Sequence, residues 1–138
     1  MKSIDQAKLY SLTGLELTMT FGTNGAGKAW LFANGRIVID ITTDAAIGDI
    51  TLTTPTDFRV LNGHSLHKNG TTSTWTVKNN TTAVFDTVTA TSIKDIDTPT
   101  TVDTAQYDFL EGDDDLKITI ATAAFLGTII LDIQFINP

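Results

Sequence analysis

The chain has 138 residues, which is enough for one domain with a hydrophobic core and too few for two ordinary ones. Its formal net charge of −7 argues against nucleic acid or an anionic membrane surface as a partner, because both require clustered Lys and Arg. The chain has no cysteine, which excludes disulfides, cysteine-ligated zinc and thiol catalysis.

The first twelve residues, MKSIDQAKLYSL, contain no apolar stretch of the kind found in signal peptides. The longest apolar run, AAFLGTIIL, has about half of the ~20 residues that a membrane helix needs, so we expect a soluble protein. Ser3 and Gln6 have the spacing of a helix capping box, and the segment fits either one or two helical turns or an extended arm. We assign residues 1–12 to an N-terminal arm and residues 13–138 to a single β-sandwich domain.

Alternation of apolar and polar side chains predicts β-strands along most of the remaining chain. The composition agrees, because 26 of the 138 residues are Thr, whose branched side chain suits a pleated surface with one wet face. The clearest patterns are LELTMTF (15–21), RIVIDIT (36–42), LKITIAT (116–122) and IILDIQF (129–135). Roughly nine or ten short strands separated by turns predict an all-β, antiparallel β-sandwich, which we assign to the jelly-roll type.

The stretch FGTNGAGKAW, which follows the first expected strand, fits the P-loop pattern from Gly22 to Lys28. A P-loop also needs a hydroxyl for Mg²⁺ at the next position, where this chain has Ala29, and a helix after the lysine, where the sequence predicts a hairpin. A nucleotide-binding enzyme is therefore the weakest interpretation. The alternative is a glycine-rich turn in which Gly22, Gly25 and Gly27 adopt positive φ angles.

Two connections carry specific turn predictions. Asn34 and Gly35 lie between two apolar runs and predict a hairpin with a type I′ turn, which needs two positive φ angles. The polar segment KDIDTPTTVDT, residues 94–104, predicts one long crossover of the kind that jelly rolls and Greek keys require.

Two clusters of potential metal ligands each have a plainer interpretation. His64 and His67 are spaced as two ligands of one metal, but the chain has no further His or Cys, so we expect two solvated turn histidines. Asp113–Asp115 follow Glu111 and fit either a Ca²⁺ site or a solvated acidic loop tip, and the spacing of an EF-hand is missing. We expect the loop tip.

Four aromatic residues fit either a sugar-stacking platform or the core: Tyr10, Trp30, Trp75 and Tyr107. We expect the core for each, because aromatic side chains bury the most surface. The sequence contains no nucleophile elbow, no zinc-protease motif and no recognisable pair of catalytic acids. We therefore expect a protein that is not an enzyme and that has no cofactor and no metal.

The segment Tyr107–Ile136, YDFLEGDDDLKITIATAAFLGTIILDIQFI, combines an acidic turn, a strand with alternating Thr, an Ala-rich bend at Gly127 and a closing strand. This order of residue types resembles the C-terminal hairpin of the capsid decoration proteins of tailed bacteriophages, which are also called cement or auxiliary head proteins. The resemblance implies a β-sandwich or jelly roll that forms a homotrimer on the outside of the capsid and clamps neighbouring subunits of the major capsid protein. It also implies a protein that is made in the host cytoplasm, resides on the virion and has no catalytic residue.

On this interpretation the N-terminal arm is a contact segment, with Ile4, Leu9, Tyr10 and Leu12 as candidate interaction residues. The main alternative is a carbohydrate- or receptor-binding β-sandwich of a tail or fibre. That alternative requires exposed aromatic side chains in a shallow groove, with Trp75 as the residue to test.

Overall fold

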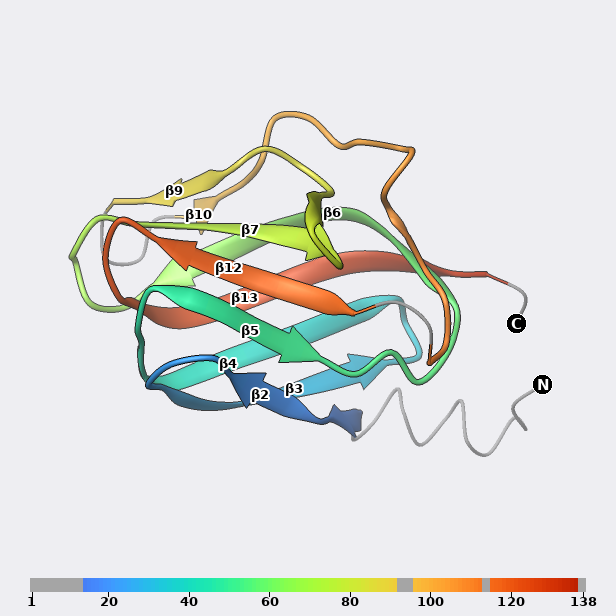
Figure 1. The fold of residues 1–138 in the computed structure, drawn as a ribbon, viewed down its shortest axis with the longest axis horizontal. Coiled ribbons are helices and arrows are strands. Elements are labelled where there is room, and N and C mark those ends of the chain that lie inside the picture. Colours follow the sequence, from blue (N-terminus) through green and yellow to red (C-terminus); the bar gives the residue numbers. More distant parts are fainter. Residues whose placement is uncertain (1–13, 92–95, 113–114, 137–138) are drawn as a thin grey trace.

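The structure is a computed structural model, and it describes residues 14–91, 96–112 and 115–136. Two antiparallel β-sheets pack face to face, and the described residues form strands and turns but no helix (Figure 1). The expected fold class, an all-β antiparallel β-sandwich, is confirmed. The expected arm or helix over residues 1–12 lies outside the described residues, and so do Ile4, Leu9, Tyr10 and Leu12.

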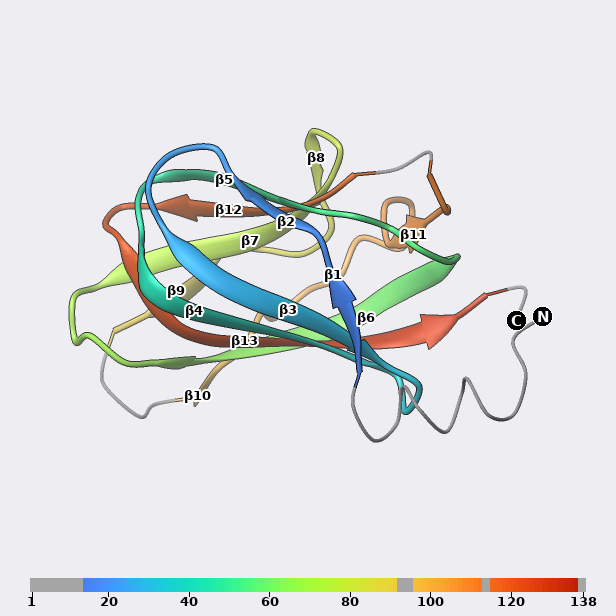
Figure 2. The same cartoon turned by 90° about the horizontal axis from the view of Figure 1, so that it is seen from below.

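The two layers, which we name sheet A and sheet B, are seen edge-on in Figure 2. The strand order of sheet A is β1 (Leu15–Leu17), β3 (Ala26–Phe32), β4 (Arg36–Ala45), β13 (Phe125–Phe135), β6 (Phe58–His67) and β10 (Ile96–Asp97), and β11 (Asp108–Phe109) also pairs with β6. The strand order of sheet B is β2 (Met19–Phe21), β5 (Gly48–Leu52), β12 (Leu116–Ala121), β7 (Ser73–Asn79) and β8 (Thr82–Ala83), and β9 (Val88–Ala90) also pairs with β7. Each sheet therefore has one face toward the core and one face away from it.

The alternation that predicts the strands also sorts their side chains between core and surface. On β4, Ile37, Ile39 and Ile41 are buried, while Val38 and Asp40 between them are partly exposed. The same alternation buries three side chains of β12 from the opposite sheet: Leu116, Ile118 and Ile120. Each fully buried aliphatic side chain contributes about 1.5–3 kcal/mol. The continuous core between the sheets is thus the main source of stability.

The pattern over residues 15–21 predicts one strand, but the structure divides it between the two sheets. β1 pairs with β3 in sheet A, and β2 pairs with β5 in sheet B (Figure 2). Between them, the Thr18 N–H donates to Thr53 Oγ1 at 3.2 Å, and the Thr53 N–H donates to the Thr18 carbonyl at 3.1 Å. Leu15, Met19 and Phe21 all pack against the core. The period-2 pattern therefore continues through the crossing, and it cannot reveal the change of sheet.

The hairpin at Asn34 and Gly35 connects β3 to β4 as expected, but its turn is not of type I′. The loop has three residues, Ala33 to Gly35, and within it only Gly35 has a positive φ, 91°. The Gly35 N–H donates to the Phe32 carbonyl at 3.1 Å. A three-residue hairpin loop needs left-handed geometry at its last position alone, which explains why one glycine is sufficient.

Residues 96–104, the described part of the expected crossover, pass between the two sheets, but they include a short strand, β10, and are not one continuous loop. The chain leaves β9 in sheet B, adds β10 to the edge of sheet A, and returns to a bridge between Val102 and Phe85. The Asp86 carboxylate holds the returning segment in place. It accepts hydrogen bonds from the N–H groups of Thr100 and Thr101, each at 2.8 Å, and from the Thr100 hydroxyl at 2.7 Å. These hydrogen bonds, from the Thr101 N–H first, lower the pKa of Asp86 to about 2 from its ordinary 3.8.

Candidate functional site

The outer face of sheet A carries a row of neighbouring apolar side chains. Trp30 on β3 lies opposite Val38 on β4, Val38 lies opposite Ile130 on β13, and Ile130 lies opposite His64 on β6. Their even positions on these strands turn them away from the core, since the odd-numbered residues beside them are buried. The row crosses four adjacent strands of one sheet.

A second row, parallel to the first, ends in the most exposed apolar residues of the face. Asp40 on β4 lies opposite Thr128 on β13, Thr128 opposite Leu66 on β6, and Leu66 opposite Ile96 on β10. Leu66 is 39 % exposed and Ile96 is 70 % exposed. Large apolar side chains that gather on one flat surface mark interaction sites in soluble proteins.

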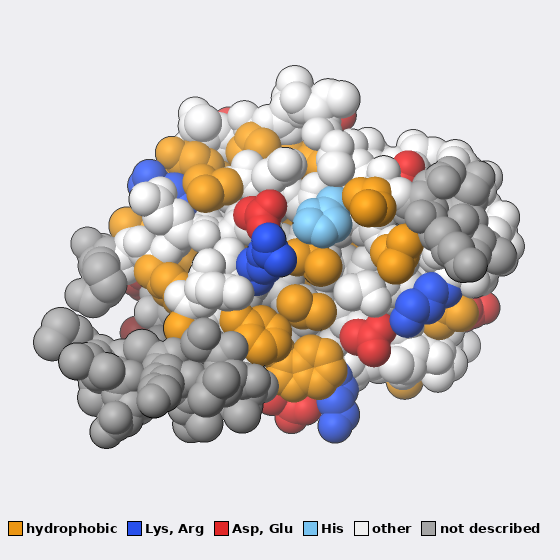
Figure 3. All heavy atoms as spheres, turned by 180° about the vertical axis from the view of Figure 1, so that it is seen from behind, with side chains coloured by type: hydrophobic (Ala, Val, Ile, Leu, Met, Phe, Trp, Pro, Cys, Tyr) orange, Lys and Arg blue, Asp and Glu red, His pale blue; other side chains and the backbone are white. Residues whose placement is uncertain are grey.

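We name this surface the sheet A face and define it by seven residues: Trp30, Phe32, Val38, His64, Leu66, Ile96 and Ile130. Figure 3 shows it as hydrophobic side chains gathered around one imidazole, with acidic and basic side chains side by side among them. Three ion pairs lie on this face: Lys28–Glu16 at 3.7 Å, Arg36–Asp132 at 3.6 Å and Lys68–Asp40 at 3.5 Å. Such exposed pairs contribute about 0–1 kcal/mol each. Their main effect is to balance the charge of the face.

The P-loop-like stretch does not have the geometry of a phosphate-binding loop. Gly27 and Lys28 belong to β3, so a strand follows where a P-loop requires a helix. Lys28 Nζ lies 3.7 Å from Glu16 on the sheet A face. The prediction of three positive φ angles holds only for Gly25, at 150°. Gly22 and Gly27 instead allow close packing, because an added Cβ would press against the carbonyls of Asp49 and Asp40 respectively.

The two histidines are strand residues, so the expectation of two solvated turn histidines is wrong. Both lie on β6, and their separation of three positions sends them to opposite faces of sheet A. His67 is fully buried, donates from Nε2 to the Thr71 carbonyl at 2.7 Å, and packs against the Phe125 ring at 5.2 Å. His64 is partly exposed on the sheet A face. One metal ion cannot bridge them, and the described residues contain no other group suited to a metal.

The aromatic residues divide between core and surface. Trp75 is fully buried, as expected, and its Nε1 donates to Ser65 Oγ at 2.9 Å. Tyr107 packs against the edge of the core, and the Arg59 guanidinium lies 4.8 Å from its ring centre. Trp30 is only partly buried and lies on the sheet A face, which contradicts its expected core position. A sugar-stacking site built on Trp75 is excluded by its burial. Tyr10 lies outside the described residues.

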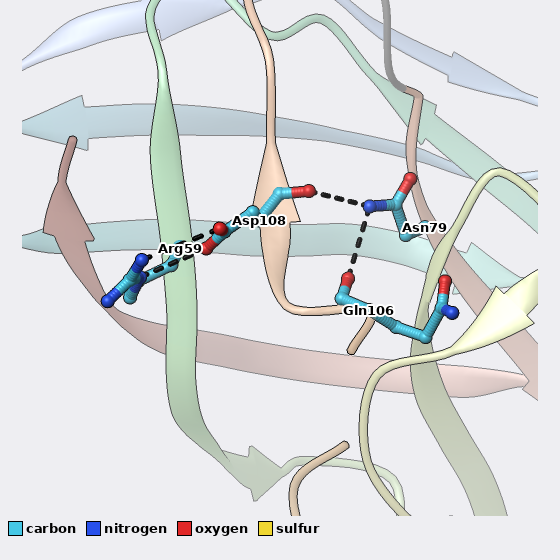
Figure 4. Close-up of polar contacts among 4 residues, drawn as sticks. All are labelled: Arg59, Asn79, Gln106 and Asp108. Carbon is cyan, nitrogen blue, oxygen red and sulfur yellow. Dashed lines mark hydrogen bonds and ion pairs between the residues drawn. The ribbon is translucent and has the colours of Figure 1, made fainter. Parts of the chain in front are cut away.

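A polar cluster that the sequence did not reveal ties the two sheets together at one end (Figure 4). Asn79 of β7 donates from Nδ2 to the carbonyls of Gln106, at 3.1 Å, and Asp108, at 2.7 Å. The Asp108 carboxylate accepts two hydrogen bonds from Arg59 of β6, at 3.0 and 3.4 Å. The side-chain hydrogen bond to Asp108 raises the pKa of the Arg59 guanidinium above its ordinary value. The Asn79 amide and the Arg59 guanidinium both bond to groups of the protein itself, which indicates a structural role.

The acidic turn is described only in part, because Asp113 and Asp114 lie outside the described residues. On either side of that gap, the Glu111 N–H donates to Asp57 Oδ1 at 2.8 Å and the Asp115 N–H donates to Asn80 Oδ1 at 2.9 Å. These contacts position the two ends of the turn.

Comparison with known proteins does not identify a family for this chain. No protein-family model, no curated protein and no solved structure matches this chain. Within the described residues, no helix has the length and apolar character needed to cross a membrane.

Proposed function

We propose that this chain is a structural virion protein, which decorates and stabilises a tailed-phage capsid by binding the outside of the major capsid shell. The observation that carries the proposal is the sheet A face. Its apolar side chains lie on four adjacent strands and are interleaved with balanced ion pairs. A broad surface of this composition suits a protein partner.

We further propose that the sandwich is of the jelly-roll type. The strand orders support this: β4-β13-β6-β10 in sheet A faces β5-β12-β7-β8 in sheet B. The consecutive pairs β4 and β5, β6 and β7, and β12 and β13 each have one member in either sheet. This alternation is what two nested Greek keys produce. Such a rigid sandwich suits a protein that acts by shape and contact.

The test is co-sedimentation of the purified chain with capsids assembled from the major capsid protein of its phage. We expect saturable binding at a fixed number of copies per capsid subunit, together with a higher melting temperature of the capsid. A β-sandwich of similar size and net charge is the control. Binding no stronger than that of the control contradicts the proposal.

A shortened chain that lacks residues 1–12 tests the contact arm separately. We expect its sandwich to fold, because no described core residue is removed, and its capsid binding to weaken. Unchanged binding means that the arm is not a capsid contact, while the decoration role itself stands or falls with the full-length chain.

A carbohydrate-binding module is the second candidate, and one observation favours it. Trp30 and Phe32 are both partly exposed and lie on the same side of β3. Their rings offer the kind of apolar surface on which a sugar stacks. Glycan-array binding that is lost in Trp30→Ala, with an unchanged melting temperature, would support this candidate. We expect no glycan binding by the wild-type chain.

A further inference from the structure

We propose that the sheet A face binds a second copy of this chain, face to face about a twofold axis. The same face carries the proposed capsid contact, so a second copy and the capsid compete for it, and the twofold dimer is the form of the free chain rather than the homotrimer that the resemblance implies on the capsid. The apolar row Trp30, Val38, Ile130 and His64 forms its centre.

The charge on the sheet A face is compatible with a second copy as the partner. The described residues contain six basic side chains, and three of them lie on the sheet A face beside three acidic ones: Lys28, Arg36 and Lys68. The other described residues carry nine acidic and only three basic side chains. The sheet A face combines exposed apolar side chains with balanced charge, so two copies can meet there without net like charge.

The arrangement of charges along β4 fits a twofold contact. Arg36 and Asp40 lie two residues to either side of Val38, at equal distances of about 6.6 Å along the strand, and all three face outward. The proposed twofold axis lies in the plane of contact and runs along the apolar row, across the strands. Rotation about this axis exchanges the side of the row that carries Arg36 with the side that carries Asp40. It places Arg36 of one copy opposite Asp40 of its partner, and Asp40 opposite Arg36.

The neighbouring strand repeats this complementarity. On β13, Asp132 and Thr128 flank Ile130 in the same way, and Thr128 lies beside Asp40, whose carboxylate is 3.5 Å from Lys68 Nζ. The same axis therefore brings Asp132 of one copy toward Lys68 of the other. Opposite charges thus meet along β4, and Asp132 of β13 approaches Lys68 beyond the end of β6, while the apolar row packs on itself.

The test measures mass by size-exclusion chromatography with light scattering, and affinity by analytical ultracentrifugation. We expect a dimer for the wild-type chain and a monomer for Ile130→Asp, which places an unpaired charge at the centre of the contact. The control is Ile47→Asp, because Ile47 is 55 % exposed and lies outside the sheet A face. That variant should remain a dimer.

Charge reversal gives the sharper test. Arg36→Asp alone and Asp40→Arg alone should each raise the dissociation constant by roughly a hundredfold or more, because like charges then oppose each other twice. An equimolar mixture of the two variants should restore dimers, since every Asp of one variant then faces an Arg of the other. Far-UV circular dichroism of each variant excludes misfolding as the cause.

Three results overturn the proposal. The first is a wild-type chain that stays monomeric at a protein concentration on the order of millimolar, at which even a weak dimer would form. The second is a trimer or dimer that persists in Ile130→Asp, which places the contact elsewhere. The third is a wild-type monomer that dimerises only after residues 1–12 are removed, which identifies that segment as the cover of the face.

Discussion

Trp75 of sheet B donates a hydrogen bond to Ser65 of sheet A at 2.9 Å, in the centre of the core. The indole also meets the Phe85 ring edge-on, with 5.7 Å between ring centres. Gly63, two residues before Ser65 on β6, leaves space for it, because a Cβ there would lie 3.3 Å from the indole. One side chain thus links both layers of the sandwich.

Removing either partner of this hydrogen bond should destabilise the protein. We expect Ser65→Ala to lower the free energy of unfolding by about 1–3 kcal/mol, because the buried indole N–H loses its acceptor. Trp75→Phe should cost at least as much, because it adds a cavity. Urea unfolding followed by circular dichroism measures both. Thr89→Ser is the control, because Thr89 is exposed on β9 outside the sheet A face, and this change should stay within about 0.5 kcal/mol.

Two glycines with positive φ should respond very differently to alanine. Gly127 has φ 155°, and an added Cβ would collide with the Leu66 carbonyl on the neighbouring strand. Gly112 has φ 75°, and nothing lies within 4 Å of its added Cβ. We expect Gly127→Ala to cost roughly 2–6 kcal/mol and Gly112→Ala only about 1 kcal/mol, from backbone strain alone. Equal losses in thermal unfolding would contradict the collision as the cause.

The Asp86 carboxylate should make stability depend on acid pH. Its folded pKa of about 2 lies below its ordinary 3.8, so its contribution is fully present above pH 4 and is lost as the pH falls toward 2. We expect the urea midpoint of Asp86→Asn to fall less steeply over this window than that of the wild type. Thr100→Val, which removes the hydroxyl donor, should lie between the two. Identical slopes for all three proteins would refute the assignment.

Asn79 should limit local opening of residues 106–109, the segment to which it bonds in Figure 4. Its amide satisfies the carbonyls of Gln106 and Asp108, so Asn79→Ala leaves both without this donor. We expect a loss of about 1–3 kcal/mol and faster hydrogen exchange over residues 106–109. Lys78→Ala, on the neighbouring residue of the same strand, should leave this exchange unchanged.

The P-loop-like stretch should not bind nucleotide. Lys28 lies in β3 and faces Glu16, so no ring of backbone N–H groups at a helix start is available for a phosphate. We expect no change of melting temperature with Mg²⁺ and ATP, for the wild type or for Lys28→Ala. A shift that disappears in Lys28→Ala would restore the nucleotide-binding interpretation.

The sequence predicted the fold class because local periodicity and tertiary burial agree. The alternating residues of β4, β12 and β13 are buried as their pattern indicates, and the hairpin at Gly35 lies where the turn residues place it. The prediction from sequence failed where residue types that are common in turns lie within a strand. The strands around His64 and His67 contain Asn, Gly and His, which are typical of turns, so their position within β6 was missed.

The sheet A face was also missed, although a signal was present. Val38 and Ile130 are apolar residues at positions where alternation expects polar ones, which indicates a strand that is apolar on both faces. Nothing in the sequence says that these two residues lie opposite each other, because β4 and β13 are about 90 residues apart in the chain and their pairing is a property of the whole sheet.

The sequence alone thus determined that this chain builds strands with one apolar side, since that property depends on the period of neighbouring residues. Only the tertiary structure decided which strands lie side by side. That choice brought Trp30, Val38 and Ile130 into one surface, placed Arg36 and Asp40 on its two flanks, and buried Trp75 against Ser65. The physical reason is that strand pairing and sheet packing are long-range contacts, selected by the burial of the complete core rather than by any local segment.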